Sequence, residues 1–354
     1  MELTKPLQFS AAVVALTTLL MYTNLLPTVI GNIVLVLLFS IVYLVYSAKR
    51  KGFSLQIAIP ITISLGIVAI NKDPSLSSII LLWILYDIFN HEQIDTQKIA
   101  KTFFISGVIG YISIVLAYIT VGLNKHADLE MWRINRIITR SSLGFQQPNT
   151  SMMYALALIM SMLIAYKMTW VKTATVLLVV CGLYHYNQSR TAFVLIILIL
   201  LMNQFNLVWP WPKAVLIGTG ILSYMLLVLP INPVLNDILS GRLRLYHSYT
   251  ESLGIHLLAN SNANNTMLDN SYIQMILSKC IIFTIIFAVS ILIIIKTKTK
   301  ISKILVLAYV LSAFTETTFL HFDLLFPILL VSNTLYKGHK DDINTTSNSS
   351  CTSI

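Results

Sequence analysis

The chain has 354 residues, of which 56% are hydrophobic and only 11% are charged. A soluble globular protein carries about 25% charged residues, so this composition excludes a soluble domain and indicates a polytopic membrane protein. The formal net charge of +10 is the lysine and arginine excess expected of cytoplasmic loops, and we expect no nucleic-acid partner.

About a dozen apolar stretches follow one another along the chain, with short polar breaks between them. The basic cluster Lys49-Arg50-Lys51 sets the orientation, because positively charged loops stay in the cytoplasm. The sequence therefore predicts an all-α integral membrane protein of about 12 transmembrane helices, with the N and C termini cytoplasmic and a large external loop between helices 9 and 10. The first six spans are expected at about 7–22, 27–47, 54–70, 76–90, 102–122 and 148–166.

This predicted topology consists of a single polytopic membrane domain, residues 1–338, and a polar cytoplasmic tail, residues 339–354. The expected external loops lie at about 124–147 and 231–270. The first apolar stretch lacks a convincing small-residue cleavage site, so we expect an anchor and not a removed signal peptide. Two cysteines lie in apolar segments and one in the tail, which implies no disulfide framework.

The arginines are distributed unevenly between the two sides of the membrane. The only arginine expected inside is Arg50, and the six expected outside are Arg133, Arg136, Arg140, Arg190, Arg242 and Arg244. A guanidinium group binds phosphate or carboxylate through two parallel hydrogen bonds, whereas lysine acts as a point charge. We therefore infer an external anionic ligand. The alternative is that these arginines contact lipid headgroups.

The first three of these arginines fall in the polar segment from Glu130 to Asn149. Their spacing of three and then four residues would put all three on one face of a helix. That helix is either an ordinary solvated loop helix or an anion clamp beside the membrane.

Three inward-running helices are expected to begin on the outer side at Pro148-Asn149, Ser189-Arg190 and Asp269-Asn270. Proline suits the first helical turn, and serine, aspartate and asparagine are good N-caps. Each motif alone is more simply a well-made helix start. Together with the arginines, their free N–H groups favour a phosphate site built from helix ends.

Depth in the membrane adds two candidates. The apolar stretch from Lys172 to Tyr186 would span only roughly 22 Å of a ~30 Å core, so we expect the tip from Asn187 to Arg190 to be recessed in a water-filled cavity. Glu316 lies about 20 Å from the cytoplasmic Lys303, and an acidic side chain at that depth should face a cavity. Asp87, near an inner helix end, is interpreted as a helix-packing or interfacial residue.

Four short motifs follow one another along the predicted outer face. They are Arg140-Ser141-Ser142-Leu143-Gly144-Phe145-Gln146-Gln147-Pro148-Asn149, Ser189-Arg190-Thr191, Ser240-Gly241-Arg242 and Leu268-Asp269-Asn270-Ser271-Tyr272. In this order they resemble the motifs of bacterial Wzy-type polysaccharide polymerases, in the superfamily of O-antigen ligases and polymerases.

The resemblance implies a glycosyltransferase of the bacterial cytoplasmic membrane that acts on its outer face. Such an enzyme joins undecaprenyl-diphosphate-linked oligosaccharide repeat units into a capsular polysaccharide, exopolysaccharide or O-antigen, alongside flippase and chain-length regulator proteins. The related ligases tend to carry a His-Asn pair where this chain has Asp269-Asn270, and this difference leaves the identity of the base open.

The reaction needs groups that hold a diphosphate and a group that accepts the proton of an acceptor hydroxyl. The candidate bases are Asp269, His247 and Glu251, with His256 on the same loop; Asp269 could instead simply cap its helix. No cofactor and no metal are expected, because nucleotide-binding and zinc motifs are missing and the lipid diphosphate is itself the activated donor. The candidate binding residues are Arg133, Arg136, Arg140, Asn149, Arg190, Arg242, Arg244 and Glu316.

Two other functions are compatible with the sequence. A lipid-linked glycan ligase would share the arginines and the topology, and only the acceptor would differ. A transporter or flippase for lipid-linked sugars would more typically show internal repeats and broken helices, and the sequence indicates neither.

The topology is directly testable by cysteine labelling. Cysteines introduced at Lys125 and Asn262 should react with a membrane-impermeant thiol reagent in intact cells, because both sites are predicted to be external. A cysteine introduced at Thr299 should not react. The reverse pattern would contradict the whole path.

Overall fold

The computed structural model describes residues 3–50, 55–71, 73–91, 94–133, 136–239, 241–258 and 268–332. These residues are mostly helical, which confirms the predicted helical character of the chain. The predicted cytoplasmic tail, the labelling site Asn262, Lys51 and Ser240 lie outside the described residues.

The N-terminal half contributes six helices to the bundle, and two of them, α1 and α5, pack together and against α6. The glycines Gly107 and Gly110 of α5 allow this close approach, because an added Cβ would lie within 3 Å of side chains of α6 and α1 respectively. The six helices are α1 Thr4–Tyr22, α2 Thr28–Arg50, α3 Leu55–Asn71, α4 Ser78–His91, α5 Thr96–Val121 and α6 Pro148–Ala165.

The C-terminal half adds the remaining helices. Three helices, α6, α14 and α15, carry buried residues on nearly all sides and form the centre of the bundle, as expected of helices that are apolar all round. The bounds are α7 Trp170–Asn187, α8 Arg190–Gln204, α9 Pro212–Val228, α10 Pro233–Ile238, α11 Arg242–Leu253, α12 Ser271–Gln274, α13 Ile281–Ile294, α14 Lys300–Thr315 and α15 Phe322–Ser332.

Within the described residues, the four helices α1, α2, α5 and α6 are long and apolar enough to cross a membrane, and six further apolar helices are shorter. Large apolar side chains are exposed on the outer faces of the bundle, among them Ile41 of α2, Ile119 of α5 and Leu178 of α7. Exposed apolar surface of this extent is typical of a protein that faces lipid. The number of spans and the side on which each loop lies remain predictions.

The helix predicted through the first three external arginines is wrong. The chain instead forms an antiparallel hairpin of β1 Leu129–Arg133 and β2 Arg136–Arg140, in which Arg133 is paired with Arg136 and Leu129 with Arg140. Isoleucine and threonine favour a strand over a helix, and the run Ile137-Ile138-Thr139 explains the difference. The side chains of Arg133 and Arg136 lie outside the described part of the structure.

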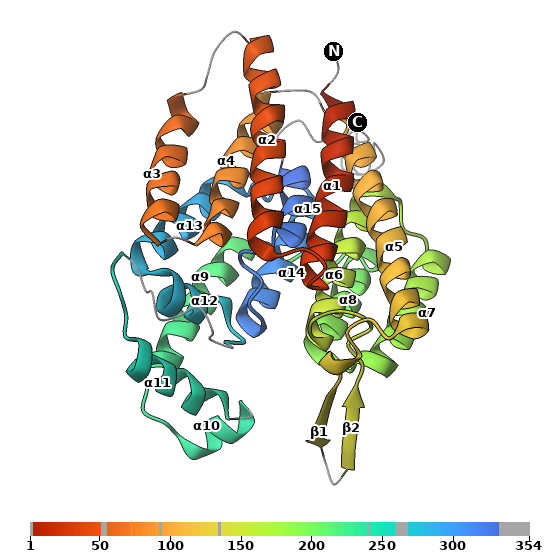
Figure 1. Cartoon of the computed structure of the whole chain (residues 1–354), viewed down its shortest axis with the longest axis vertical. Helices are drawn as coiled ribbons and strands as arrows, with labels where there is room; N and C mark the ends of the chain where they lie inside the picture. The colour runs from red at the N-terminus through yellow and green to blue at the C-terminus, as the bar shows by residue number, and fades with distance from the viewer. Residues whose placement is uncertain are drawn as a thin grey trace, which may run out of the picture.

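Figure 1 shows where the two expected external loops lie. The hairpin β1–β2 and the helices α10 and α11 project from the same end of the molecule, opposite the start of α1. The described parts of the two segments that the sequence assigns to the outer side, residues 124–147 and 231–270, therefore share one end of the bundle.

The tenth predicted span is interrupted near its start. The helix α12 passes into a π-helical turn, Met275–Lys279, and the chain then adopts φ +84° at Cys280 before α13 begins. The expectation that no helix is broken was therefore wrong here. The last residue of the π-helical turn, Lys279, is partly buried and pairs with Asp73, and such π-helical turns are frequent at functional sites.

Asp87 has the packing role that the sequence predicted. Its side chain is buried, accepts a hydrogen bond from the Tyr43 hydroxyl at 3.2 Å and lies 3.6 Å from the Arg50 guanidinium. These contacts join α4 to α2.

Candidate functional site

The site is built around the turn between α14 and α15. Helix α14 ends at Thr315, and the backbone is extended at Glu316. The hydroxyl of Ser271 holds this turn, because it donates to the Glu316 carbonyl oxygen at 2.6 Å and accepts from the N–H groups of Thr318 and Phe319 at 2.7 and 3.2 Å. The first residue of α12 thus fixes the position of Glu316.

A chain of hydrogen bonds connects Glu316 to the hairpin. The amide nitrogen of Asn149 lies 3.1 and 3.3 Å from the two carboxylate oxygens of Glu316. The amide oxygen of Asn149 accepts from Arg140 Nη2 at 2.5 Å. Asn149 stands in the first turn of α6, directly after Pro148, and this proline occupies the first helical position as predicted.

Asn187 lies in the tip that the sequence predicted to be recessed, but the sequence did not single it out as a candidate site residue. It is fully buried at the end of α7, and its carbonyl oxygen accepts from Arg140 Nε at 3.1 Å. Its amide nitrogen donates to the carbonyl oxygen of Ser141 and the hydroxyl of Ser151 at 3.1 and 2.7 Å. Asn187 therefore joins the base of the hairpin to α6 and fixes the orientation of the Arg140 guanidinium.

A second pair of charges stands on the other side of Glu316. Arg242 Nη2 lies 3.0 Å from Asp269 Oδ2, and both side chains are more than one third exposed. Their neighbours in sequence, Leu243 and Leu268, are buried in a small apolar cluster. This cluster anchors Arg242 and Asp269, and its members are Leu226, Leu227, Leu243, Tyr246, Leu268, Ile273 and Leu277, with Leu239, Tyr249 and Phe314 at its margin.

Asn270, and not Asp269, caps the following helix. Its amide oxygen accepts from the N–H groups of Tyr272 and Ile273 at 2.9 and 3.1 Å, and its amide nitrogen donates to Ser223 at 3.0 Å. The carboxylate of Asp269 is therefore not needed for capping.

Arg140 and the Arg242–Asp269 pair both affect the pKa of the Glu316 carboxyl. Burial, and after it the charge of Asp269, raise the pKa of Glu316 from its ordinary value of 4.5 to about 7. Arg242, the hydrogen bond from Asn149 and Arg140 all act to lower this pKa. Such effects need proximity, so Arg140, Arg242 and Asp269 all lie near Glu316, whose carboxyl exchanges protons near neutral pH.

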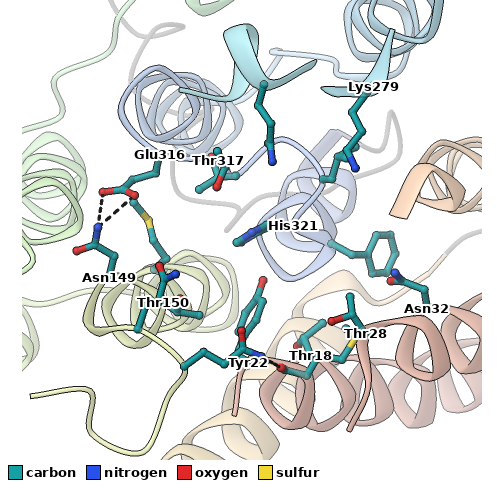
Figure 2. Close-up of a pocket in the computed structure, with 18 residues that line it drawn as sticks. Thr18, Tyr22, Thr28, Asn32, Asn149, Thr150, Lys279, Glu316, Thr317 and His321 are labelled. Atoms are coloured by element: carbon teal, nitrogen blue, oxygen red, sulfur yellow. Dashed lines mark hydrogen bonds between the residues drawn. The ribbon is translucent and has the colours of Figure 1, made fainter. Parts of the chain in front are cut away.

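Glu316 also lines a polar pocket with a volume of about 350 Å³, at the lower end of the range of small-molecule sites. The walls come from α1, α2, α6, α12 and the turn that follows α14. Figure 2 shows Tyr22 and Asn32 on one side of this pocket, Glu316 and Asn149 on another, and His321 between them. The prediction that Glu316 faces a cavity is confirmed.

The other predicted site residues lie outside this pocket. Arg190, Arg244 and Glu251 have exposed side chains. His247 is partly buried on α11, and its Nε2 atom has no hydrogen-bond partner among the described residues. His256 is exposed and its ring contacts the Leu253 carbonyl oxygen.

The tip from Asn187 to Arg190 is buried in part. Helix α7 extends over Trp170–Asn187, and its 18 residues are longer than the 15-residue stretch on which the predicted recess depended. Asn187 and Ser189 are buried at this tip, whereas the side chain of Arg190, which begins α8, is exposed. The depth of the tip in the membrane stays a prediction. Ser189 stands at the N-cap position, but its side chain makes no capping hydrogen bond.

No group of three histidine, cysteine, aspartate or glutamate side chains that could hold a metal ion occurs within the described ranges. Comparison of the chain with protein-family models, with curated proteins and with solved structures gives no match. The argument for function therefore depends on the residues of the site.

The raised pKa of Glu316 predicts a pH dependence of stability. Between the ordinary value of 4.5 and about 7, the folded chain keeps a proton that the unfolded chain has released. The free energy of unfolding should therefore fall as the pH rises through this window. Glu316→Gln removes the titrating group, so from pH 5 to pH 8 the melting temperature of the detergent-purified wild type should fall by a few degrees more than that of this variant. Parallel melting curves would contradict the assignment.

Proposed function

We propose that this protein is a polysaccharide polymerase of the bacterial cytoplasmic membrane. It joins undecaprenyl-diphosphate-linked oligosaccharide repeat units into a capsular polysaccharide, exopolysaccharide or O-antigen on the outer face. The growing glycan is transferred from its lipid carrier to the non-reducing end of a new lipid-linked repeat unit. One observation supports this proposal above the others, namely the gathering of two arginines and Asp269 near Glu316, which lines a polar pocket at the end of the bundle that carries the described parts of both predicted external loops.

The arginines supply what a diphosphate leaving group requires. As the bond between the anomeric carbon of the donor and the diphosphate oxygen breaks, that oxygen keeps the electron pair and negative charge grows on it. Fixed guanidinium groups stabilise this charge at little cost in reorganisation. Arg242 at the rim, with the exposed Arg244 beside it in sequence, is suited to contact a diphosphate at the membrane surface. Arg140 is suited to act deeper in the site.

Glu316 is the best-placed proton acceptor. The acceptor hydroxyl loses its proton as its oxygen bonds to the anomeric carbon, and a base is most effective when its pKa lies near the working pH. The Glu316 carboxyl fits this requirement, since its pKa is about 7, and it lines the pocket. Asp269, the candidate ranked first from the sequence, is paired with Arg242 and in this mechanism orients that arginine.

A reconstituted assay tests the proposal. Purified protein in liposomes, given the lipid-linked repeat unit of its own strain, should produce a ladder of lengthened glycans on the lipid carrier. A single transfer to a different lipid would instead identify a ligase. No covalent change, together with movement of the lipid-linked sugar across the bilayer, would identify a transporter and refute the proposal.

The geometry of Arg140 predicts the result of a conservative substitution. Its Nε and Nη2 atoms make hydrogen bonds to two different acceptors, and a lysine ammonium on a flexible stem does not reproduce this fork. We expect Arg140→Lys to lose nearly as much polymer as Arg140→Ala, at normal membrane levels of protein. Polymer of normal length and amount from Arg140→Lys would show that only the charge matters.

Amide variants distinguish the roles of Glu316 and Asp269. Glu316→Gln should lower the rate of transfer by about 10²–10⁴-fold, because an amide cannot accept the proton. Asp269→Asn should keep more activity and shift the acid limb of the pH–rate profile to lower pH, because the charge that raises the pKa of Glu316 is removed. Full activity of Glu316→Gln with loss in Asp269→Asn would return the role of base to Asp269.

A further inference from the structure

Most of the side chains that line the polar pocket are uncharged and can form hydrogen bonds. The pocket lies between α1 and α2 on one side and α6, α12 and the turn after α14 on the other (Figure 2). Its threonines and amides are Thr18, Thr28, Asn32, Gln146, Gln147, Asn149, Thr150, Gln274, Thr317 and Thr318. The rest of the wall is formed by the aromatic side chains of Tyr22 and Phe322, by His321, by the apolar Met21, Met153 and Leu320, and by the charged Lys279 and Glu316.

Many of these polar groups have no partner in the protein. Among the described residues, no side-chain hydrogen bond is made by Asn32, Thr150 or Thr317. The same holds for three further lining residues, Thr28, Gln147 and Gln274. Thr28 and Gln147 are exposed to solvent, whereas Asn32, Thr150, Gln274 and Thr317 are partly buried in the pocket wall. The donors and acceptors of these four side chains are free to bond to a ligand that carries many donors and acceptors.

The charges around the pocket argue against an anionic ligand. The Lys279 ammonium at its edge is paired with Asp73. Burial lowers the pKa of His321 to about 4, so the imidazole in the pocket is neutral at pH 7, and its Nδ1 atom has no partner within the described residues. The arginines of the site are not among the residues that line this pocket.

We propose that this pocket binds a neutral sugar residue, namely the end of the acceptor repeat unit that is extended. The hydroxyl groups of a sugar both donate and accept hydrogen bonds, as the amides and threonines require. The apolar face of the ring packs against Tyr22 or Phe322. A volume of about 350 Å³ accommodates a small ligand, so the remainder of the repeat unit extends outward.

This inference rests on the proposed function, because only that function identifies the ligand as an acceptor. It also assigns the diphosphate and the acceptor sugar to different parts of the site. Glu316 is shared, since it lines the pocket and is electrostatically coupled to Arg242 and Asp269. The diphosphate is held on the arginine side, the acceptor sugar lies on the pocket side, and the glycosidic bond forms at the carboxylate between them.

The test is a binding measurement that needs no catalysis. The ligand is the repeat-unit oligosaccharide released from the lipid carrier of the source strain, and its dissociation constant for the purified protein is measured by saturation-transfer NMR. In the triple variant Asn32→Leu, Thr150→Val, Thr317→Val, each polar group is replaced by an apolar one of similar shape. These side chains make no hydrogen bond within the described protein, so their replacement leaves no buried partner unsatisfied.

The triple variant should bind the oligosaccharide at least about tenfold more weakly than the wild type, since three neutral hydrogen bonds are lost. Thr120→Val is a matched control, because Thr120 is exposed on the outer face of α5 and its hydroxyl bonds to its own helix; this variant should bind as the wild type does. Arg242→Gln should also bind normally, and inorganic pyrophosphate should not displace the sugar.

Three results would overturn the pocket assignment: no binding to the wild type, unchanged binding to the triple variant, or displacement by pyrophosphate. A different result would refute the proposed function. A wild-type protein that binds the oligosaccharide through these three side chains, yet makes no product ladder in liposomes, would refute the polymerase and leave the sugar site standing. A ladder from the wild type together with unchanged binding to the triple variant would refute only the sugar site.

Discussion

The contact between Asn149 and Glu316 is the interaction on which the site depends. It joins residues that are 167 positions apart in the sequence, one at the start of α6 and the other after the end of α14. Both helices are buried at the centre of an apolar bundle, where a polar side chain without a partner is costly. Hydrogen bonding between an amide and a carboxyl that exchanges protons near neutral pH reduces this cost and keeps an ionisable group inside the protein.

Around this contact, each polar group is held by an element that is itself held by apolar packing. Arg140 is oriented by the buried Asn187. Arg242 and Asp269 are held in position by the buried leucines next to them in the sequence. The interruption after α12 brings Gln274 and Lys279 to the polar pocket. A rigid apolar scaffold with polar groups at helix ends and breaks suits a site that must fix the geometry of its reactants.

The broken tenth helix bears on the choice between an enzyme and a transporter. Broken helices are common in transporters, where they form substrate sites near the middle of the bilayer. Here the break is combined with a cluster of arginines and carboxylates and with a pocket of unpartnered neutral groups. Paired acid and base groups of this kind serve bond formation, and for this reason we favour an enzyme that acts on a lipid-linked sugar.

The sequence by itself determined the features that depend on local pattern. Apolar periods predicted the helices, Pro148 marked the start of α6, and the depth of Glu316 predicted a residue that faces a cavity. Only the tertiary structure decided which distant residues meet. In the tertiary structure Asp269 is paired with Arg242, Asn187 is buried while Arg190 is exposed, and the arginine-rich segment forms a hairpin. Strand pairing and long-range hydrogen bonds depend on partners that no local spacing specifies, because burial and tertiary packing select among the conformations that each segment allows.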